Sequence, residues 1–150
     1  LVLPVTVLIT RRFGGDEAGR AVTVTRLLAA FAAFLKITDL APAIEGGEFP
    51  LVRFVIAFVA SAMVGQYVAV TVYDLTRGGG AWWRAPLLAA LIGYAVHSML
   101  YFPIAYWNGS YPWINWLVTD FAIKTIVALA FLPLYHILQK PLRPRGGYGG

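Results

Sequence analysis

WWRAPLLAALIGYAVHSMLYFPIAYW, residues 82–107, is the stretch of sequence that decides the fold. After Arg84 it contains no Lys, Arg, Asp or Glu, and tryptophans stand at both of its ends. About 20 apolar residues are enough for a helix to cross the hydrocarbon of a bilayer. The stretch therefore predicts a membrane-spanning helix whose ends lie at the two interfaces, where tryptophan is enriched.

The whole chain has the composition of an integral membrane protein. Of its 150 residues, 59% are hydrophobic and only 13% are charged, and the mean hydropathy is +0.71. Soluble domains typically have about a quarter of their residues charged. There is no cysteine, which excludes disulfides, thiolate metal sites and cysteine nucleophiles. We expect the lipid bilayer as a partner and no nucleic acid, because the charge of +5 lies mainly outside the apolar segments.

The apolar segments predict an all-α bundle of about five transmembrane helices in one domain, residues 1–138. A basic, disordered cytoplasmic tail is predicted at 139–150. A polar turn at 14–17 separates the first two segments, and Arg26 is expected to extend towards the headgroups. The segments are 1–10, 21–37, 51–73, 82–107 and 113–138. Because the first is about half a span, we expect a helix upstream and a parent with six helices.

The charges between the segments alternate from one side of the membrane to the other. The loop that contains Glu45 and Glu48 has no Lys or Arg and lies opposite the basic loops and the tail. The positive-inside rule then predicts a multi-pass protein of the cell inner membrane with a cytoplasmic C-terminus. The basic residues on that side are Arg11, Arg12, Arg20, Arg77, Arg84, Lys140, Arg143 and Arg145.

Three polar residues in different segments converge at one depth. At 1.5 Å per helical residue, His97 lies about 15 Å from the boundary at Trp107, and Lys124 about 16 Å from the same boundary at Trp113. Gln66 lies about 16 Å from the opposite boundary at Arg77. In a hydrocarbon layer about 30 Å thick, all three are near the midplane.

Helical spacing adds more residues to this predicted site. Tyr94, His97, Ser98 and Tyr101 follow the i, i+3, i+4, i+7 rule and form one stripe, while Asp120 and Lys124 are four residues apart and can pair. Such a site suits a flat, polar, partly aromatic ligand. The predicted substrate-binding residues are Gln66, Tyr94, His97, Ser98, Tyr101, Asp120 and Lys124. A purely structural role for these groups, as bonds between helices, is the alternative.

The sequence offers little support for an enzyme, and we expect no cofactor and no metal. It contains no metal-binding motif, and the glycines at 78–80 lack the ending of a phosphate-binding loop. Ser98, His97 and Asp120 resemble the members of a serine hydrolase triad only by residue type. Adjacent residues on a helix point about 100° apart, which is a poor geometry for a nucleophile and its base.

Several runs resemble the queuosine precursor transporters, which belong to a vitamin-uptake-transporter-like group of six-helix membrane proteins. The runs are TVLITRRFG (6–14), GQYVAVTVYDLTR (65–77), WWRAP (82–86), YFPIAYW (101–107) and FLPLYHIL (131–138), with Asp120 and Lys124 before the last. The resemblance implies import of a 7-deazaguanine precursor. The Gln66 and Lys124 positions match the family, whereas Val7, Ala69 and His97 stand where the family has acidic residues.

We therefore expect a transporter that imports a small, flat nitrogen heterocycle of the queuosine precursor type. Two alternatives stay open: a binding subunit of an ATP-driven importer, and a structural membrane protein without transport activity. A homo-oligomer is possible, and neither the coupling ion nor the oligomeric state follows from the sequence.

Overall fold

A computed structural model of the chain describes residues 2–40, 50–107 and 109–144. The described part forms α1 (Val2–Phe13), α2 (Gly15–Leu40), α3 (Pro50–Thr76), α4 (Arg84–Tyr106) and α5 (Trp113–Leu138). The predicted all-α fold is confirmed. The loop with Glu45 and Glu48 lies outside the described residues, as does the tail from residue 145, whose disorder stays a prediction.

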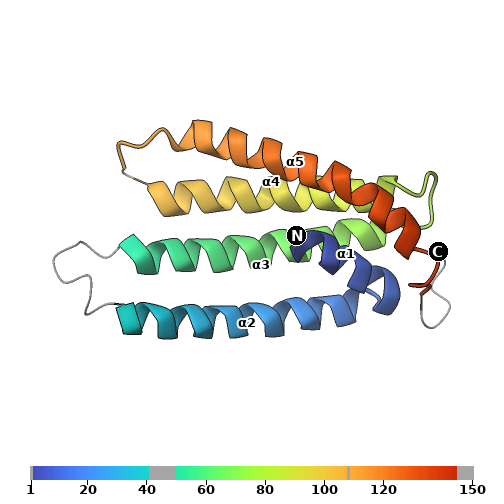
Figure 1. The fold of residues 1–150 in the computed structure, drawn as a ribbon, viewed down its shortest axis with the longest axis horizontal. Coiled ribbons are helices and arrows are strands. Elements are labelled where there is room, and N and C mark those ends of the chain that lie inside the picture. The colour runs from blue at the N-terminus through green and yellow to red at the C-terminus, as the bar shows by residue number, and fades with distance from the viewer. Residues whose placement is uncertain (1, 41–49, 108, 145–150) are drawn as a thin grey trace.

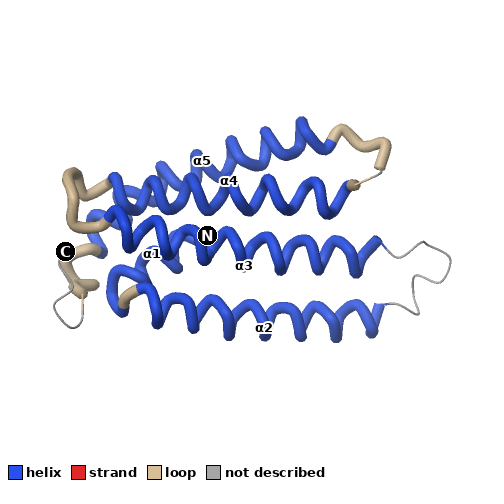
Figure 2. The backbone as a smooth tube through the Cα atoms, turned by 180° about the vertical axis from the view of Figure 1, so that it is seen from behind, coloured by secondary structure: helices blue, strands red, loops and turns tan. Residues whose placement is uncertain are grey.

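Helices α2, α3, α4 and α5 lie side by side in sequence order, each antiparallel to the one before it (Figure 1). The shorter α1 packs against α2, α3 and α4 and also touches α5. Figure 2 shows the same order from behind. Helices α3 and α4 are therefore the centre of the bundle, and polar groups on their middle turns can meet side chains from the other three helices.

Helices α3 and α4 approach so closely at Gly65 and Gly93 that neither position has room for a side chain. A Cβ on Gly65 would lie 2.6 Å from the carbonyl oxygen of Gly93, and one on Gly93 would lie 2.8 Å from that of Gly65. Ala57, Ser61 and Ala69, spaced four residues apart on the same face as Gly65, are also buried. Small residues at this spacing let membrane helices pack backbone to backbone.

Three helical stretches among the described residues are long and apolar enough to cross a membrane: Arg53–Thr76, Arg84–Tyr106 and Trp113–Leu138. Helix α1 has only 12 residues. Helix α2 has 26 residues, and averaged over its whole length it is less hydrophobic than α3, α4 and α5, because charged residues such as Arg20 and Arg26 interrupt its apolar residues. Among the described residues, length and composition therefore identify three of the roughly five predicted spans.

Helix α2 begins at Gly15, well before the predicted segment, so the predicted polar turn at 14–17 is wrong except at its first residue. Gly14 has φ +91°, in the left-handed region that glycine adopts freely, and it makes the sharp turn after α1. Asp16 and Glu17 then occupy the first turn of α2. Carboxylates are favourable there because the amino end of a helix carries partial positive charge.

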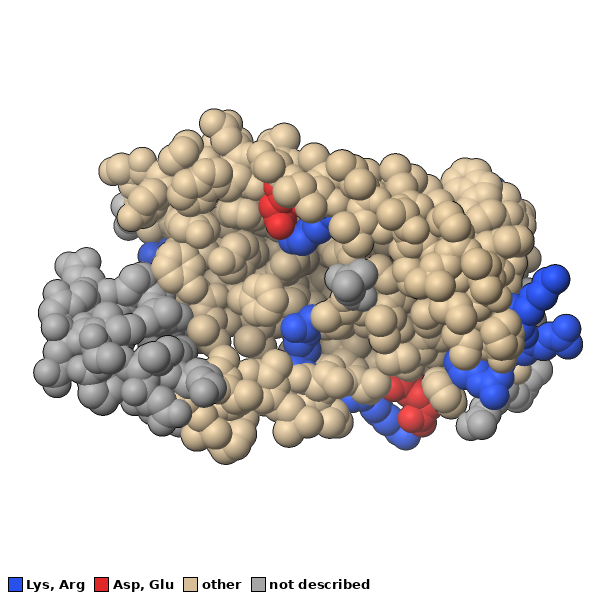
Figure 3. Space-filling model, viewed as in Figure 1, with Lys and Arg blue, Asp and Glu red and all other residues tan. Residues whose placement is uncertain are grey.

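The predicted alternation of charge appears as one basic end of the bundle, where α1, α3 and α5 end and α2 and α4 begin (right-hand end of Figure 1). Blue Lys and Arg atoms gather at that end in Figure 3. Trp82 and Trp83 are partly exposed beside it, and Trp107 is exposed at the opposite end. Both placements suit the membrane interfaces.

Arg53 stands at the opposite end and holds the carboxyl end of α4. Its Nε donates to the carbonyl oxygen of Ile104 at 2.5 Å, and its Nη1 donates to that of Trp107 at 3.0 Å. The last carbonyls of a helix have no partner within the helix. A cation at this position also interacts favourably with the helix dipole.

Candidate functional site

Polar side chains of α4 and α5 form one hydrogen-bonded cluster near the middle of both helices. Lys124 Nζ lies 2.8 Å from Nδ1 of His97 and 3.0 Å from Oγ of Ser98. It also pairs with Oδ2 of Asp120, one turn earlier on α5, at 2.5 Å. A lysine ammonium has three donors and no acceptor, so these contacts account for all of its hydrogens. We call these four residues the lysine cluster.

The same bonds define the state of His97. Because an ammonium can only donate, Nδ1 of His97 accepts, and a neutral ring then carries its hydrogen on Nε2. Nε2 is buried and has no hydrogen-bond partner among the described residues. A buried donor without an acceptor is costly. The site therefore presents an N–H group that an acceptor on a ligand can satisfy.

Ser98 makes hydrogen bonds to both members of the ion pair. Its hydroxyl donates to Oδ2 of Asp120 at 2.6 Å and accepts from Lys124, and the side chain is 1% exposed. In the described part of the chain no hydrogen bond joins Ser98 to His97. This is the outcome that the 100° angle between neighbouring helical residues predicts.

A second polar cluster joins α1, α2 and α3 at Gln66. Arg26 Nε donates to Oε1 of Gln66 at 2.5 Å, and Nε2 of Gln66 donates to Oγ1 of Thr6 at 2.7 Å. The guanidinium also lies 6.0 Å from the ring centre of Phe58. The expectation that Arg26 extends to the headgroups is wrong, because an amide oxygen and an aromatic ring on α3 hold it inside the bundle. We call Thr6, Arg26 and Gln66 the arginine cluster.

A cavity of about 150 Å³ lies between the two clusters. A second one, of about 360 Å³, lies between α1 and α2 and shares Arg26 and Gln66 with the first. In Figure 3 this face of the molecule is hollowed and shows isolated charged atoms among uncharged residues. The first cavity is lined by Val2, Leu3, Arg26, Phe58, Ala62, Gln66, Tyr94, His97 and Lys124.

Gly65 explains why the two clusters come so close together. A Cβ on this glycine would lie 3.0 Å from the Cβ of His97, so the backbone of α3 lies directly against His97. Gln66, the member of the arginine cluster that lies on α3, is the next residue after Gly65. The close packing of α3 on α4 thus brings Arg26 and Lys124, from helices that are not in contact, to one cavity.

Aromatic rings surround the cavity. Lys124 Nζ lies 6.0 Å from the ring centre of the buried Tyr94, and Phe58 packs edge-on against His97 at 5.8 Å between ring centres. Tyr101 lies 6.0 Å from the His97 ring and 6.2 Å from Phe58. A flat ligand in this space can stack on aromatic faces while its edge meets the polar groups.

The charged groups at the cavity sum to a positive charge. Arg26 and Lys124 are both cations, and Asp120 is the carboxylate that pairs with Lys124. Among the side chains that the structure describes, no carboxylate forms an ion pair with Arg26. Buried charges are normally paired. The unbalanced charge of Arg26 favours a ligand that brings an acceptor or a negative charge.

The structure brings four of the seven predicted site residues to the cavity wall: Gln66, Tyr94, His97 and Lys124. Ser98 and Asp120 lie behind Lys124 and hold its ammonium. Tyr101 does not line the cavity and belongs to the aromatic group around it. That any of these residues binds a ligand stays a prediction.

Arg26 and Thr6 were not among the predicted site residues. Arg26 lies eleven residues after Gly15, the true start of α2, or about 16 Å along the helix axis. That is the depth calculated for Gln66, so the signal was present but hidden by the wrong helix boundary. Nothing in the sequence pointed to Thr6. A threonine hydroxyl in a helix can bond to a carbonyl of its own helix, as Thr6 does to Val2, and so needs no partner on another helix.

Comparison with known proteins assigns the chain to a family. The family model described as "Putative vitamin uptake transporter" matches residues 1–138. The "Queuosine precursor transporter" of Escherichia coli is 30% identical over 95 residues, which are 59% of this chain and 42% of that protein. The "Probable queuosine precursor transporter" of Haemophilus influenzae is 25% identical over 146 residues, which are 89% of this chain and 62% of that protein.

The chain spans less than two thirds of the length of either curated relative. No solved structure matches it. The match over residues 1–138 is the basis for assigning the chain to this family. The geometry of the site is known from the structure of this chain alone.

Proposed function

The chain belongs to the vitamin uptake transporter family, and on that premise we propose that it imports a small, flat nitrogen heterocycle, a queuosine precursor of the 7-deazaguanine type. The names of the two relatives support this substrate class. The long apolar helices support a multi-pass membrane protein.

The observation that carries the proposal is the cavity between the arginine and lysine clusters. Arg26, Gln66, His97 and Lys124 come from four different helices and line one space in the middle of the bundle. Polar side chains are costly inside a membrane and mark substrate pathways there. A ligand in this cavity contacts α2, α3, α4 and α5 at the same time. Movement of these helices around the bound ligand can then open the cavity first to one side of the membrane and then to the other.

The proposed contacts follow from the donors and acceptors at the cavity. A deazaguanine offers a carbonyl oxygen, ring nitrogens and N–H groups along its edge. Arg26, Lys124 and Nε2 of His97 donate to its acceptors, while the amide of Gln66 can both donate and accept. Tyr94 and Phe58 face the ring. Transport then proceeds by helix rearrangement without covalent chemistry.

Binding requires that the contact between Arg26 and Gln66 opens. The cavity of about 150 Å³ is smaller than usual ligand pockets, which measure about 300–1,000 Å³. The neighbouring cavity of about 360 Å³ is also lined by these two side chains, which are thus common to both cavity walls. Rotation of the Arg26 guanidinium towards a ligand joins the two spaces and replaces one hydrogen bond by another.

The positive charge of the site makes the proposed substrate neutral or anionic. A precursor with an uncharged 7-substituent, such as 7-cyano-7-deazaguanine, adds no like charge to Arg26 and Lys124. Its 7-aminomethyl analogue carries a cationic amine, which these residues repel. Two unit charges 4 Å apart interact by about 4 kcal/mol at an effective dielectric constant of 20.

We propose that the basic end of the bundle and the C-terminus are cytoplasmic, which the positive-inside rule supports. The proposed location is the cell inner membrane. Import then moves the heterocycle from the cavity towards the end where Arg11, Arg77 and Arg84 lie.

Uptake by proteoliposomes that contain only the full-length protein tests this function. We expect accumulation of labelled 7-cyano-7-deazaguanine, competed by the unlabelled compound and weakly by the 7-aminomethyl analogue. Uptake of another heterocycle, with none of the deazaguanines, contradicts the substrate. Binding without uptake, restored by co-purified ATPase subunits, favours the ATP-driven alternative. The structural alternative predicts neither binding nor uptake.

A further inference from the structure

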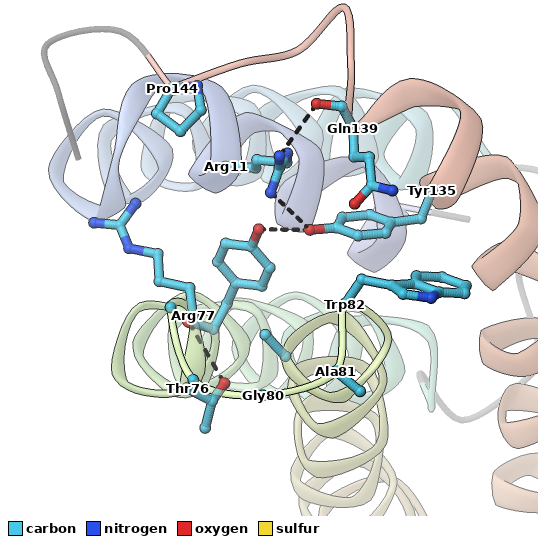
Figure 4. Close-up of a pocket in the computed structure, with 13 residues that line it drawn as sticks. Arg11, Thr76, Arg77, Gly80, Ala81, Trp82, Tyr135, Gln139 and Pro144 are labelled. Carbon is cyan, nitrogen blue, oxygen red and sulfur yellow. Dashed lines mark hydrogen bonds between the residues drawn. The ribbon is translucent and has the colours of Figure 1, made fainter. Parts of the chain in front are cut away.

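The basic end of the bundle contains a cavity of about 240 Å³ that shares no lining residue with the proposed substrate cavity (Figure 4). It lies between the ends of α1, α3 and α5 and the turn that joins α3 to α4. Neither an Asp nor a Glu of the described chain lines it. The lining residues are Arg11, Tyr73, Thr76, Arg77, Gly78, Gly79, Gly80, Ala81, Trp82, Ala85, Tyr135, Gln139 and Pro144.

Arg11 is one of two arginines at the wall of this cavity, and it has no anionic partner among the described residues. Its Nη1 donates to the hydroxyl of Tyr135 at 3.3 Å and its Nη2 to the carbonyl oxygen of Gln139 at 3.1 Å. Its Nε is buried and has no hydrogen-bond partner among the described residues. No carboxylate of the described chain forms an ion pair with Arg11. A guanidinium held only by neutral groups retains its full positive charge.

Two buried tyrosines add a donor beside Arg11. The hydroxyls of Tyr73 and Tyr135 lie 2.7 Å apart and share one hydrogen bond, and each side chain is at most 2% exposed. Two hydroxyls carry two hydrogens, and their mutual bond uses one of them. Because Arg11 donates to Tyr135, it takes up an acceptor position and no hydrogen. One tyrosine hydrogen is therefore left for an acceptor in the cavity.

The rim of the cavity carries a residue type that is typical of the membrane interface. Trp82 lines it and is 44% exposed, and tryptophans of membrane proteins collect at this interface. The turn just before Trp82 contains Gly78, Gly79 and Gly80, and a Cβ at either of the first two would meet no atom within 4 Å. The first two glycines therefore leave this side of the cavity uncrowded.

We propose that this cavity, the Arg11 pocket, binds a phosphate group. A phosphate supplies the negative charge that Arg11 lacks and accepts hydrogen bonds from its Nε and from the tyrosine pair. Arg77, on the opposite wall, adds a second guanidinium that also pairs with Asp74. Both the headgroup phosphate of an anionic lipid and free inorganic phosphate have this chemistry. Basic pockets between helices at the membrane surface commonly hold lipid headgroups.

Binding of phosphatidylglycerol to the full-length protein tests the proposal. The protein is placed in nanodiscs of phosphatidylcholine with increasing phosphatidylglycerol, and retained lipid is counted by native mass spectrometry. Arg11→Gln removes the cation and is expected to weaken retention about tenfold, the usual effect of losing a charged hydrogen bond. Tyr73→Phe keeps the ring, removes one hydroxyl and is expected to weaken retention by two- to threefold.

Arg20→Gln is the matched control, since it removes the same charge at the same end. Arg20 is exposed and pairs with Glu17 at 2.9 Å, so retention is expected to stay within twofold of wild type. Should Arg11→Gln fail to fold, Arg11→Lys keeps the charge and tests the geometry. Loss of lipid retention there supports the Nε contact.

Inorganic phosphate distinguishes the two sources of the group. Phosphate that displaces phosphatidylglycerol, or that alone raises the melting temperature of wild type and not of Arg11→Gln, supports the pocket. Equal retention by wild type, Arg11→Gln and Arg20→Gln overturns the proposal. So does an absence of binding by both probes. Uptake of the heterocycle is measured in a separate assay. A failure of the proposed transport function can therefore be told apart from a failure of phosphate binding in this pocket.

Discussion

Arg26 on α2 donates to Gln66 on α3 at 2.5 Å, although the two residues are forty positions apart in sequence. This contact turns an arginine towards the inside of the bundle, where an apolar helix surface would normally exclude it. The neighbouring cavity also receives Lys124 from α5. Two cations that converge on one space with a single carboxylate nearby are expensive to maintain, and we attribute that cost to ligand binding.

Replacement of Arg26 should weaken substrate binding more than folding. Arg26→Gln removes a charged donor at the cavity, and hydrogen bonds to charged groups contribute about 1.5–3 kcal/mol. We expect the affinity for 7-cyano-7-deazaguanine to fall at least about tenfold. Equilibrium binding to the purified full-length protein measures this, with the exposed Arg20→Gln as the control. If Arg26→Gln and Arg20→Gln lost affinity equally, the charge of Arg26 would act on the substrate only at long range and not through a direct contact.

The same variant should change the charge preference of the site. With Arg26 neutral, the cavity retains only the paired Lys124 and Asp120. The preference for the 7-cyano compound over the cationic 7-aminomethyl analogue should then narrow by about tenfold. Competition constants for both compounds, in wild type and Arg26→Gln, give this ratio. An unchanged ratio contradicts the role of Arg26 in selectivity.

Lys124 and Asp120 should be removed together to separate binding from stability. Removing one partner leaves the other charge stranded in the bundle and can cost about 3–5 kcal/mol. The double variant Asp120→Asn, Lys124→Met keeps the volume of both side chains and strands no charge. We expect a melting temperature close to that of wild type and loss of uptake. Normal uptake by this variant would assign the lysine cluster a structural role.

Gly65 should be intolerant of even one added methyl group. Its Cβ would lie 2.6 Å from the carbonyl oxygen of Gly93, so Gly65→Ala must push α3 and α4 apart. Overpacking of this kind costs about 1–3 kcal/mol. Gly79→Ala is the control, because a Cβ there meets no atom within 4 Å. Thermal unfolding in detergent should show a clear loss for the first variant and none for the second.

Arg53 should stabilise the bundle without contributing to binding. Arg53→Leu removes two hydrogen bonds to the last carbonyls of α4, and we expect a loss of about 1–3 kcal/mol. Chemical unfolding measures this loss. The affinity for the heterocycle should remain within twofold, since Arg53 is at the end of the bundle, away from the cavity. A large loss of affinity would indicate that α4 transmits changes from its end to the site.

The convergence of Gln66, His97 and Lys124 on one cavity could be predicted from the sequence. The rise per residue of a helix is constant, so the number of residues from the helix end gives the depth of each side chain. The same arithmetic failed for Arg26, because the start of α2 was placed at residue 21 and the helix begins at Gly15. Asp16 and Glu17 looked like a turn but are favourable in a first helical turn.

Tyr101 shows another limit of sequence patterns. It shares a helical face with Tyr94, yet seven residues of rise carry it about 10 Å along α4 and away from the cavity. Spacing assigns a face, whereas depth decides whether residues on that face reach one ligand. The hydrogen bond from Gln66 to Thr6 could not be predicted either, since it depends on how α1 lies across α3.

A structure of the full-length protein with bound 7-cyano-7-deazaguanine tests the central claim most directly. We expect the ring between Arg26 and Lys124, with Nε2 of His97 donating to it and the hydrogen bond from Arg26 to Gln66 opened. A ligand bound elsewhere, with Arg26 still on Gln66 and Lys124 still bonded to His97, Ser98 and Asp120, would contradict it.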